Sequence, residues 1–309
     1  MKLSRSVLWV VCFGVTACLV TPVTAFDQPA VNLGFTSFLD GGPPAGPGFY
    51  FTEYLQYYTA DELPDHASPN ADVDTFVSLN QFIYQSDQPV FLGGKWGMDV
   101  IVPIVSIDST DSTGAVTDNG GGFGDILVGP YLQWDPVMGD NGPVFMHRIE
   151  FQTLWPTGDY SNAKGLTQSS HFFSFNPYWA GTYFISPKLT TSWRVHYLWN
   201  DKNNDPFVGF GASDTQAGQA IHANFAAAYE VMPKKLRLGV NGYYLKQISD
   251  SKMNGASVSG REMVFAVGPG AIVSFSQDTH LFFNAYHETS VSYRPKGDKL
   301  VLRLVKHFR

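Results

Sequence analysis

The sequence predicts an all-β protein, a transmembrane antiparallel β-barrel of about twelve strands with short periplasmic turns and long extracellular loops. Three observations lead to this prediction. The chain begins with an export signal, its later segments alternate apolar with polar residues, and the connections between them alternate between long and short. Successive residues of a strand point to opposite faces. A membrane barrel turns one of these faces to lipid and the other to a lumen.

The first 25 residues have the pattern of a secretory signal peptide. Two basic residues, Lys2 and Arg5, precede a mostly apolar run, and Val23-Thr24-Ala25 fits a small-residue cleavage site. The apolar run is shorter than the roughly 18 residues of a spanning helix. Lipoprotein-type cleavage before Cys18 is an alternative, but the residues that follow this cysteine are apolar instead of forming a polar linker.

The composition excludes several classes of protein. The formal net charge is −7, and because the leader holds two basic residues and no acidic one, the exported part carries −9. A nucleic-acid partner is therefore not expected. Cys12 and Cys18 are the only cysteines and both lie in the leader, so the exported chain forms no disulfide. Aromatic and charged residues each make up 15% of the chain, which indicates either a surface solvated by something other than water or a large core.

Twelve segments have the residue pattern of strands. Each is close to the length of about 9 to 11 residues with which a tilted strand crosses a bilayer. They are residues 49–58, 75–85, 91–105, 124–134, 144–155, 171–185, 189–200, 217–231, 236–247, 261–275, 280–288 and 299–308.

The connections indicate the topology. Those after odd-numbered segments are long and rich in Asp, Asn, Ser and Gly, whereas those after even-numbered segments are mostly tight, such as SDQP, SPK, MPKK and SQDT. A closed antiparallel barrel places every second loop on the same side of the membrane. A soluble β-sandwich, the alternative fold, has both ends in water and no reason to sort its loops by length.

The segment 189–200 illustrates the two faces. Trp193, Tyr197 and Trp199 share a face that we expect to contact lipid, and Arg194 and His196 share the face that we expect to point inward. Inward charges can brace a narrow barrel or line a conduction path. The ionisable residues that we expect to line the lumen are Lys95, Asp99, Asp125, Arg148, Glu150, Arg194, His196, Glu230, Arg237 and Arg303.

Residues 26–48 precede the barrel, which we expect to comprise residues 49–309. Val31, Phe35, Phe38 and Leu39 fall at helical spacing, and the following GGPPAGPG would break a helix or strand. One interpretation is a plug that enters the lumen through these four apolar residues. The other is a mobile periplasmic tail.

Six further stretches are PPAGPGFYFTEYLQYY, GGGFGDILVGPYLQWDP, FQTLWPTGDYS, FFSFNPYWAGTYFISPK, VGPGAIVSF and SYRPKGDKLVLRLVKHF. In this order they resemble the outer-membrane family of meta-pathway phenol-degradation proteins, which includes the SphA-like transporters. The resemblance covers nearly the whole exported chain and implies passage of hydrophobic or aromatic compounds across the outer membrane. One departure is that Phe308 is followed by Arg309, whereas such chains commonly end on an aromatic residue.

No motif of catalytic chemistry is found. The eight histidines never form a His-x-His or His-x-x-x-His pair, so we expect no metal and no cofactor, and there is no Gly-x-Ser-x-Gly elbow. We expect a non-enzymatic channel in the bacterial outer membrane for passive uptake of small hydrophobic or aromatic compounds. Its partners would be lipid, the barrel-assembly machinery and the permeant. Two alternatives are a lipid-modifying enzyme, which needs a Ser-His pair at the lipid face, and a structural or adhesin-like barrel with an occluded lumen.

Overall fold

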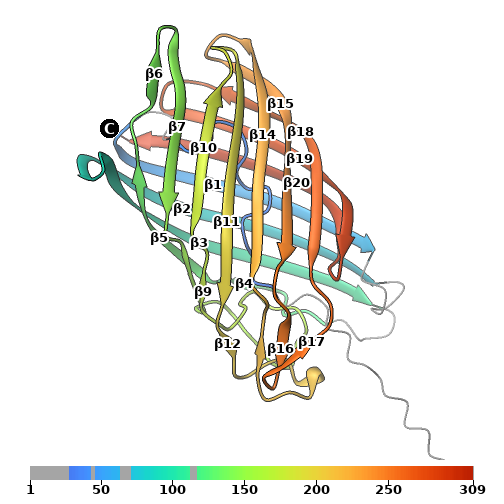
Figure 1. The fold of residues 1–309 in the computed structure, drawn as a ribbon. Helices are drawn as coiled ribbons and strands as arrows, with labels where there is room; N and C mark the ends of the chain where they lie inside the picture. The colour runs from blue at the N-terminus through green and yellow to red at the C-terminus, as the bar shows by residue number, and fades with distance from the viewer. Residues whose placement is uncertain (1–27, 43–45, 63–70, 112–116, 309) are drawn as a thin grey trace, which may run out of the picture.

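The computed structural model describes residues 28–42, 46–62, 71–111 and 117–308, and nearly all the regular structure in them is β-strand. The predicted leader lies outside these residues. The barrel is closed and antiparallel, and its wall has twelve positions, each formed by one strand or by two short strands in succession. We call these positions staves. The architecture is the one that the sequence predicts (Figure 1). No helix in the described ranges is long and apolar enough to cross a membrane.

The barrel closes where its first strand pairs with its last, from Phe49 opposite Phe308 to Glu62 opposite Lys296. Nine staves are single strands and three consist of two short strands in succession. In chain order the staves are β1 (Gly48–Glu62), β2 (Ala71–Phe91), β3 (Gly94–Asp111), β4 (Gly121–Phe123) with β5 (Ile126–Gln133), β7 (Gly142–Glu150) with β8 (Thr153–Trp155), β9 (Ser174–Phe175) with β10 (Tyr178–Phe184), β11 (Leu189–Asn200), β14 (Ala220–Met232), β15 (Leu236–Gln247), β18 (Met263–Ser274), β19 (Thr279–Ser292) and β20 (Lys296–Phe308).

Two of the divided staves, β7 with β8 and β9 with β10, were predicted as the continuous segments 144–155 and 171–185, whereas β4 lies in a stretch predicted as a loop before the segment 124–134. The breaks, at residues 124–125, 151–152 and 176–177, lie on neighbouring staves. Pro177 lies in one break and Pro130 of β5 faces another, and neither proline can donate a ladder hydrogen bond. Both proline carbonyls still accept across the break, from Phe151 N at 3.0 Å and Tyr197 N at 3.1 Å. The sheet therefore remains closed where its regular ladder is interrupted.

The tight turn predicted at residues 86–89 is wrong. Strand β2 continues to Phe91, and its register against β3 shifts between Gln85 and Pro89. The chain reverses at Leu92 and Gly93, whose φ angles of 47° and 77° are both positive, as a two-residue hairpin turn requires. Residues 86–88 form a bulge, and their polar composition resembles that of a turn.

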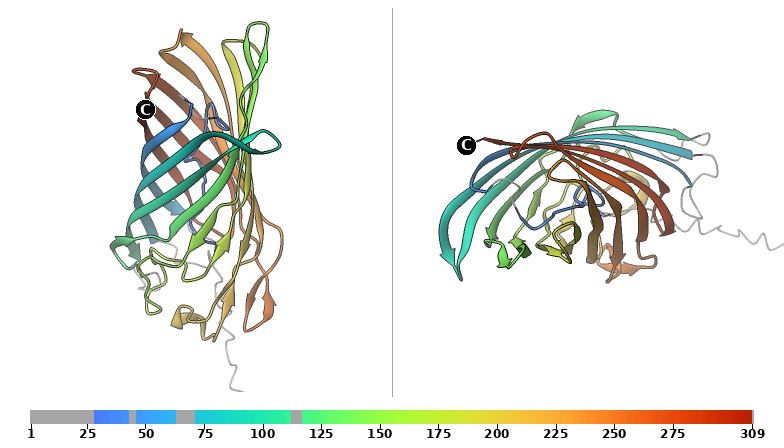
Figure 2. Two further views of the ribbon diagram at one scale, coloured as in Figure 1. Left: turned by 90° about the vertical axis from the view of Figure 1, so that its left-hand side faces the viewer. Right: turned by 90° about the horizontal axis from the view of Figure 1, so that it is seen from above.

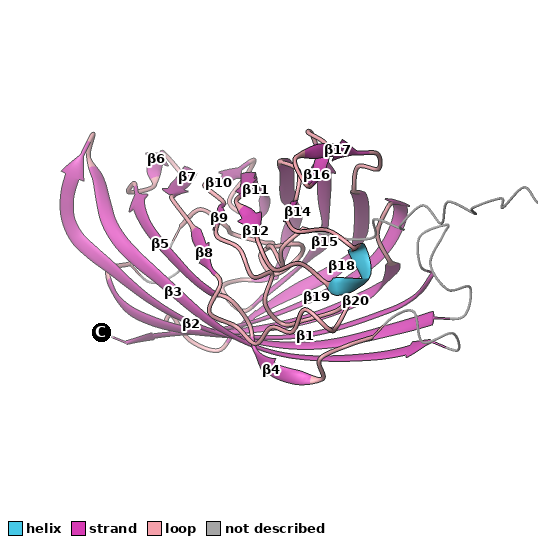
Figure 3. Cartoon of the chain, turned by 90° about the horizontal axis from the view of Figure 1, so that it is seen from below, coloured by secondary structure: helices cyan, strands magenta, loops and turns pink. Residues whose placement is uncertain are grey.

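The two ends of the barrel differ. At the outer end, the segments expected to be loops contain a four-stranded sheet of β12 (Lys202–Asn203), β13 (Thr215–Gln216), β16 (Ser251–Met253) and β17 (Ala256–Val258). Figure 3 views this end, where loops and the 3-10 helix η1 (Val208–Phe210) lie across the mouth. At the other end, β6 (Val137–Gly139) pairs with β7 in a projecting hairpin (Figure 2, left).

The burial pattern separates an outer from an inner face. In β11, Val195 and Tyr197 are exposed while Arg194 and His196 are buried. Trp193 and Trp199 are half-buried on the outer face. Large apolar side chains cover the outside of the other staves in the same way, including Phe76, Phe82 and Leu302. The apolar band that a barrel presents to lipid is thus present.

Candidate functional site: the lumen and its internal segment

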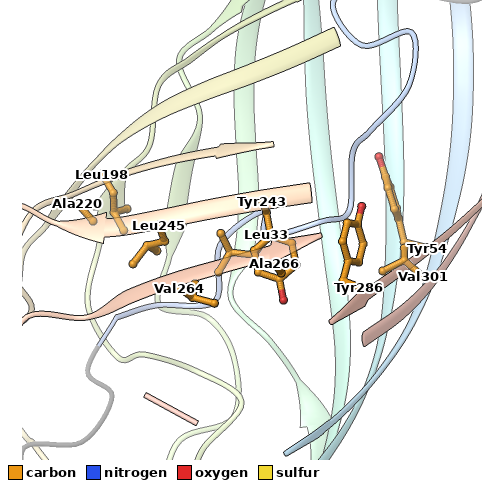
Figure 4. Packing of buried hydrophobic residues seen from close by; sticks show 10 residues of the cluster. All are labelled: Leu33, Tyr54, Leu198, Ala220, Tyr243, Leu245, Val264, Ala266, Tyr286 and Val301. Atoms are coloured by element: carbon orange, nitrogen blue, oxygen red, sulfur yellow. The ribbon is translucent and has the colours of Figure 1, made fainter. Parts of the chain in front are cut away.

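Residues 28–42 lie inside the barrel (Figure 2, right). Leu33 belongs to a buried cluster with Tyr243, Ala266 and Tyr286, which surrounds it in Figure 4. Phe38 belongs to a second cluster nearer the periplasmic end. We name residues 28–42 the internal segment.

The internal segment is not helical, so the helical spacing of its apolar residues does not describe its conformation. Val31 and Phe35 pack against the cluster of Leu33, whereas Leu39 packs against that of Phe38. Gly34 and Gly41, with φ of +86° and +90°, turn the backbone between these contacts. Barrel side chains bind the backbone groups that a helix would have satisfied internally.

The outer part of the internal segment is held by polar contacts. The Gln28 side-chain amide donates to the Gly218 carbonyl at 2.7 Å, and its backbone N–H donates to Glu262 Oε1 at 3.2 Å. The Asn200 amide donates to Gln28 Oε1 at 3.1 Å. These contacts reach three different staves or loops at the outer end.

The middle part is bound through its backbone. Asn224 accepts from Gly34 N at 2.8 Å and donates to Asn32 Oδ1 at 2.8 Å. The Tyr286 hydroxyl donates to the Gly34 carbonyl at 2.8 Å, and Lys299 Nζ donates to the Leu33 carbonyl at 2.9 Å. Buried backbone groups need such partners to avoid a desolvation penalty.

The inner part carries an ion pair. Arg194 donates to both carboxylate oxygens of Asp40, from Nε at 2.8 Å and from Nη2 at 2.6 Å. The neighbouring backbone is bound as well, because Leu39 N donates to Ser192 Oγ at 3.0 Å and Gln133 Nε2 donates to the Gly41 carbonyl at 2.8 Å. Bidentate contacts of this kind fix orientation as well as distance.

Phe38 occupies a notch made by two glycines. Gly239 on β15 and Gly270 on β18 face each other in register. A Cβ on either would lie 2.7 Å or 2.6 Å from the Phe38 ring. Only glycine at these positions leaves the barrel wall open to the aromatic side chain.

Six of the predicted lumen residues are buried in the barrel interior. Asp99 accepts from Gln81 at 2.6 Å, Arg148 donates to Gln133 at 3.0 Å, and Glu150 accepts from the Tyr178 hydroxyl. Arg303 lies over the Phe282 ring at 3.6 Å. The six are Asp99, Arg148, Glu150, Arg194, Arg303 and His196, which is stacked on His222 at 4.0 Å between ring centroids.

The remaining four predicted residues lie toward the ends of the barrel. Lys95 pairs with Asp87 at 3.0 Å and Asp135 at 2.8 Å. Arg237 lies 3.7 Å from Glu230 beside the periplasmic turns. Asp125 accepts from Gly158 N and Ser170 N and so binds an outer loop to the barrel rim. These contacts stabilise turns and loops.

A cavity of about 370 Å³ lies between the internal segment and the inner faces of β1, β2 and β3, and extends to the outer loops. Its wall is largely apolar on β2 and β3. The polar wall residues there are Thr75, Gln81 and Asp99, and the apolar ones are Val73, Val77, Leu79, Ile101, Pro103, Val105 and Ile107. Sequence reasoning missed the apolar ones, although strands apolar on both faces, such as β2 with Phe76 outside and Val77 inside, carry the signal.

Catalytic and metal chemistry finds little support. The described residues contain no group of three or more His, Cys, Asp or Glu side chains that could hold a metal. Ser274 Oγ lies 2.8 Å from His280 Nδ1, but His280 Nε2 contacts the Gln277 carbonyl at 3.2 Å instead of a carboxylate. This pair stabilises a periplasmic turn. His147, on the outer face, stacks between Trp134 and Phe145.

Twelve antiparallel staves with an apolar exterior, closed around an internal segment and a cavity, define a transmembrane β-barrel of the outer-membrane type. The chain belongs to the family described as MetA-pathway of phenol degradation, whose model matches residues 55–304.

Solved structures with a similar fold include the COG4313 outer membrane channel from Pseudomonas putida F1. It has a TM-score of 0.74 and 16% sequence identity, over 87% of this chain and 97% of that chain. Weaker matches include the transport unit of the autotransporter AIDA-I from Escherichia coli, with a TM-score of 0.48 and 12% identity over 84% of this chain and 90% of that chain. The CymD monoaromatic hydrocarbon channel has a TM-score of 0.38 and 11% identity over 86% and 91%. A search of curated protein sequences gave no significant match.

Proposed function

We propose that the protein is an outer-membrane channel that admits small hydrophobic or aromatic compounds by passive diffusion. The cavity is the observation that carries this proposal. Its wall on β2 and β3 offers a solute apolar contacts and few hydrogen bonds. It therefore favours molecules whose apolar surface is removed from water when they enter. Its volume of about 370 Å³ falls within the range of about 300–1,000 Å³ usual for small-molecule sites.

The family description supports the same class of permeant, since it refers to phenol degradation. The Pseudomonas putida protein of similar fold is named as an outer membrane channel. We further propose that the leader is cleaved after Ala25 and that the barrel-assembly machinery inserts the exported chain among outer-membrane lipids.

The internal segment acts as a plug in this proposal. Its apolar residues Val31, Phe35, Phe38 and Leu39 pack inside the lumen, and one of the predicted lumen charges, Arg194, binds it. This contact is bidentate, through both carboxylate oxygens of Asp40. Passage of a solute through the lumen would require part of the internal segment to move.

The enzyme alternative has one relevant observation, the contact between Ser274 and His280. Both side chains lie on the inner face beside a turn, not at the lipid face where a lipid-modifying enzyme needs them. The adhesin-like alternative predicts a lumen without a ligand cavity. The apolar cavity favours the channel.

The test is uptake of a fluorescent naphthalene-class probe by intact cells that express the protein and lack comparable channels. We expect expression to raise the initial uptake rate several-fold, and Ile101→Asp in the cavity wall to remove most of this gain. The control must lie away from the lipid-facing surface. Met98→Asp would not serve, because Met98 lies on the outer face of the same strand, where a charge would disturb the contact with the membrane. Asp140→Asn, in an exposed periplasmic turn, is the matched control for expression and should leave uptake unchanged. Uptake equal to that of cells without the protein would refute the proposal.

A further inference from the structure

The most unusual charge beside the cavity is that of Lys299 on β20. Its side chain is 7% exposed, and its Nζ donates to the Leu33 carbonyl at 2.9 Å and lies 4.6 Å from the centroid of the Tyr243 ring. Within the described ranges no ion pair joins this ammonium to a carboxylate, although a buried charge is normally paired. Lys299 also lines the cavity.

A second cation, Arg294, lines the same part of the cavity. Its Nη1 lies 3.6 Å from Glu262 Oε2. Glu262 is not part of the cavity wall and is occupied from the other side by the Gln28 backbone N–H. The Arg294 guanidinium therefore lies between the Glu262 carboxylate and the cavity.

The nearby carboxylate Glu288 is also withdrawn from the cavity. It accepts from the hydroxyls of Tyr58 at 3.0 Å and Tyr243 at 2.8 Å, and from Gly297 N at 2.8 Å. It is fully buried and does not line the cavity. Glu262 and Glu288 are thus held by protein groups away from the cavity, whereas Lys299 and Arg294 line its wall. The carboxylate of Asp99, which also lines the cavity, accepts from Gln81 Nε2 at 2.6 Å.

We propose that the cavity binds amphiphiles with an anionic head group, such as a carboxylate on an alkyl or aromatic body. This inference rests on the proposed function, because it takes the cavity as the site of the permeant. The carboxylate contacts Lys299 and Arg294, and the apolar body lies along the wall that includes Leu79 and Ile101. The Leu33 carbonyl uses one of the three ammonium donors of Lys299, so two remain for the anion.

The chemistry discriminates by the sign of the head group. A carboxylate gains charge-assisted hydrogen bonds from both cations. A neutral alcohol of the same length gains only apolar burial and ordinary hydrogen bonds. An ammonium head would meet two like charges at this end of the cavity.

The experiment compares three probes of equal chain length, dodecanoate, dodecanol and dodecylamine. Each probe is titrated calorimetrically into the refolded full chain, in an uncharged detergent at a concentration too low to compete with the probe. We expect dodecanoate to bind about tenfold more tightly than dodecanol, the order expected for charge-assisted hydrogen bonds, and dodecylamine to bind more weakly than both. Lys299→Met should remove the advantage of dodecanoate and leave dodecanol binding unchanged, and Lys299→Arg should retain it. Lys246→Met, the same substitution at an exposed site on β15, is the matched control.

The gel shift of the unheated protein checks that each variant is folded. Equal binding of all three probes, or tightest binding of dodecylamine, would overturn the anionic head-group inference and leave the hydrophobic channel standing. Absence of binding by all three probes would instead contradict the channel proposal itself.

Discussion

Arg194 on β11 and Asp40 of the internal segment form a bidentate ion pair inside the barrel, across 154 positions of sequence. Both side chains are nearly excluded from solvent, with exposures of 9% and 7%. Removing one partner of a buried pair leaves an uncompensated charge, which typically costs about 3–5 kcal/mol. The pair therefore links the position of the internal segment to the wall of the barrel.

Asp40→Asn should loosen the internal segment. We expect single-channel conductance in planar bilayers to rise several-fold, and deletion of residues 27–39 to raise it at least as much, while the barrel still folds. Phe35→Asp should reproduce part of the effect. Asp140→Asn, in an exposed periplasmic turn, should leave conductance at the wild-type level. Wild-type conductance in a folded deletion variant would show that the segment does not limit the pore.

Gly270→Ala should displace the internal segment without changing any charge. The added Cβ would lie 2.6 Å from Phe38 and 2.9 Å from Asn284 Oδ1, and overpacking of this kind typically costs about 1–3 kcal/mol. We expect a lower midpoint of thermal unfolding and higher conductance. Phe38→Leu in the same chain should restore part of both, because it vacates the notch.

The control for this substitution is Gly121→Ala, where the nearest atom to an added Cβ is Ser106 Oγ at 3.9 Å. It should leave both quantities unchanged. If Gly270→Ala also left the unfolding midpoint and the conductance unchanged, the notch at Gly239 and Gly270 would not determine the position of Phe38.

Much of this arrangement can be predicted from the sequence, and the reasons are local. The bounds of β11 and β15 match the predicted segments 189–200 and 236–247, because both are bordered by turn residues and alternate without interruption. The turn at Leu92 and Gly93 was missed because the polar bulge before it has the composition of a turn. The partner of Arg194 was missed for a different reason, since no periodicity connects a strand to an irregular segment that precedes the barrel.

The orientation of the barrel predicts which sites antibodies can reach. An epitope inserted between Asn254 and Gly255, at the tip of the β16–β17 hairpin, should be detected on intact cells. Epitopes inserted beside Pro187 or Pro233, in turns at the opposite end, should be detected only after the outer membrane is opened. Detection of all three on intact cells would contradict the topology.

An outer loop should respond to acid in a defined way. Asp118 accepts hydrogen bonds from Ser109 Oγ at 2.6 Å, Ser109 N at 3.0 Å and Gly120 N at 2.9 Å. The bond from the Ser109 side chain, followed by the backbone bonds, holds the pKa of Asp118 below its ordinary value. A carboxylate of lowered pKa stabilises the fold at pH values above its ordinary pKa of about 3.9, and loses this effect as the pH falls through the lowered value.

Limited proteolysis of the loop should therefore be unchanged between pH 7 and about pH 5, within the range where Asp118 stays ionised. An acid-stable protease should cleave it faster only below the ordinary Asp pKa. Asp118→Asn should give the faster cleavage at every pH. Faster cleavage of the wild type already at pH 5 would assign the response to another group.

The direction of the internal segment constrains the order in which the molecule is assembled. Gln28 contacts Gly218 near the outer end, whereas Gly41 contacts Gln133 near the periplasmic end, and the chain then enters β1. Since β1 seals the barrel by pairing with β20, the internal segment comes directly before the strand that completes the wall. Its N-terminal end must reach the outer part of the lumen, so a bulky folded tag joined directly to that end should delay assembly even if every strand is intact.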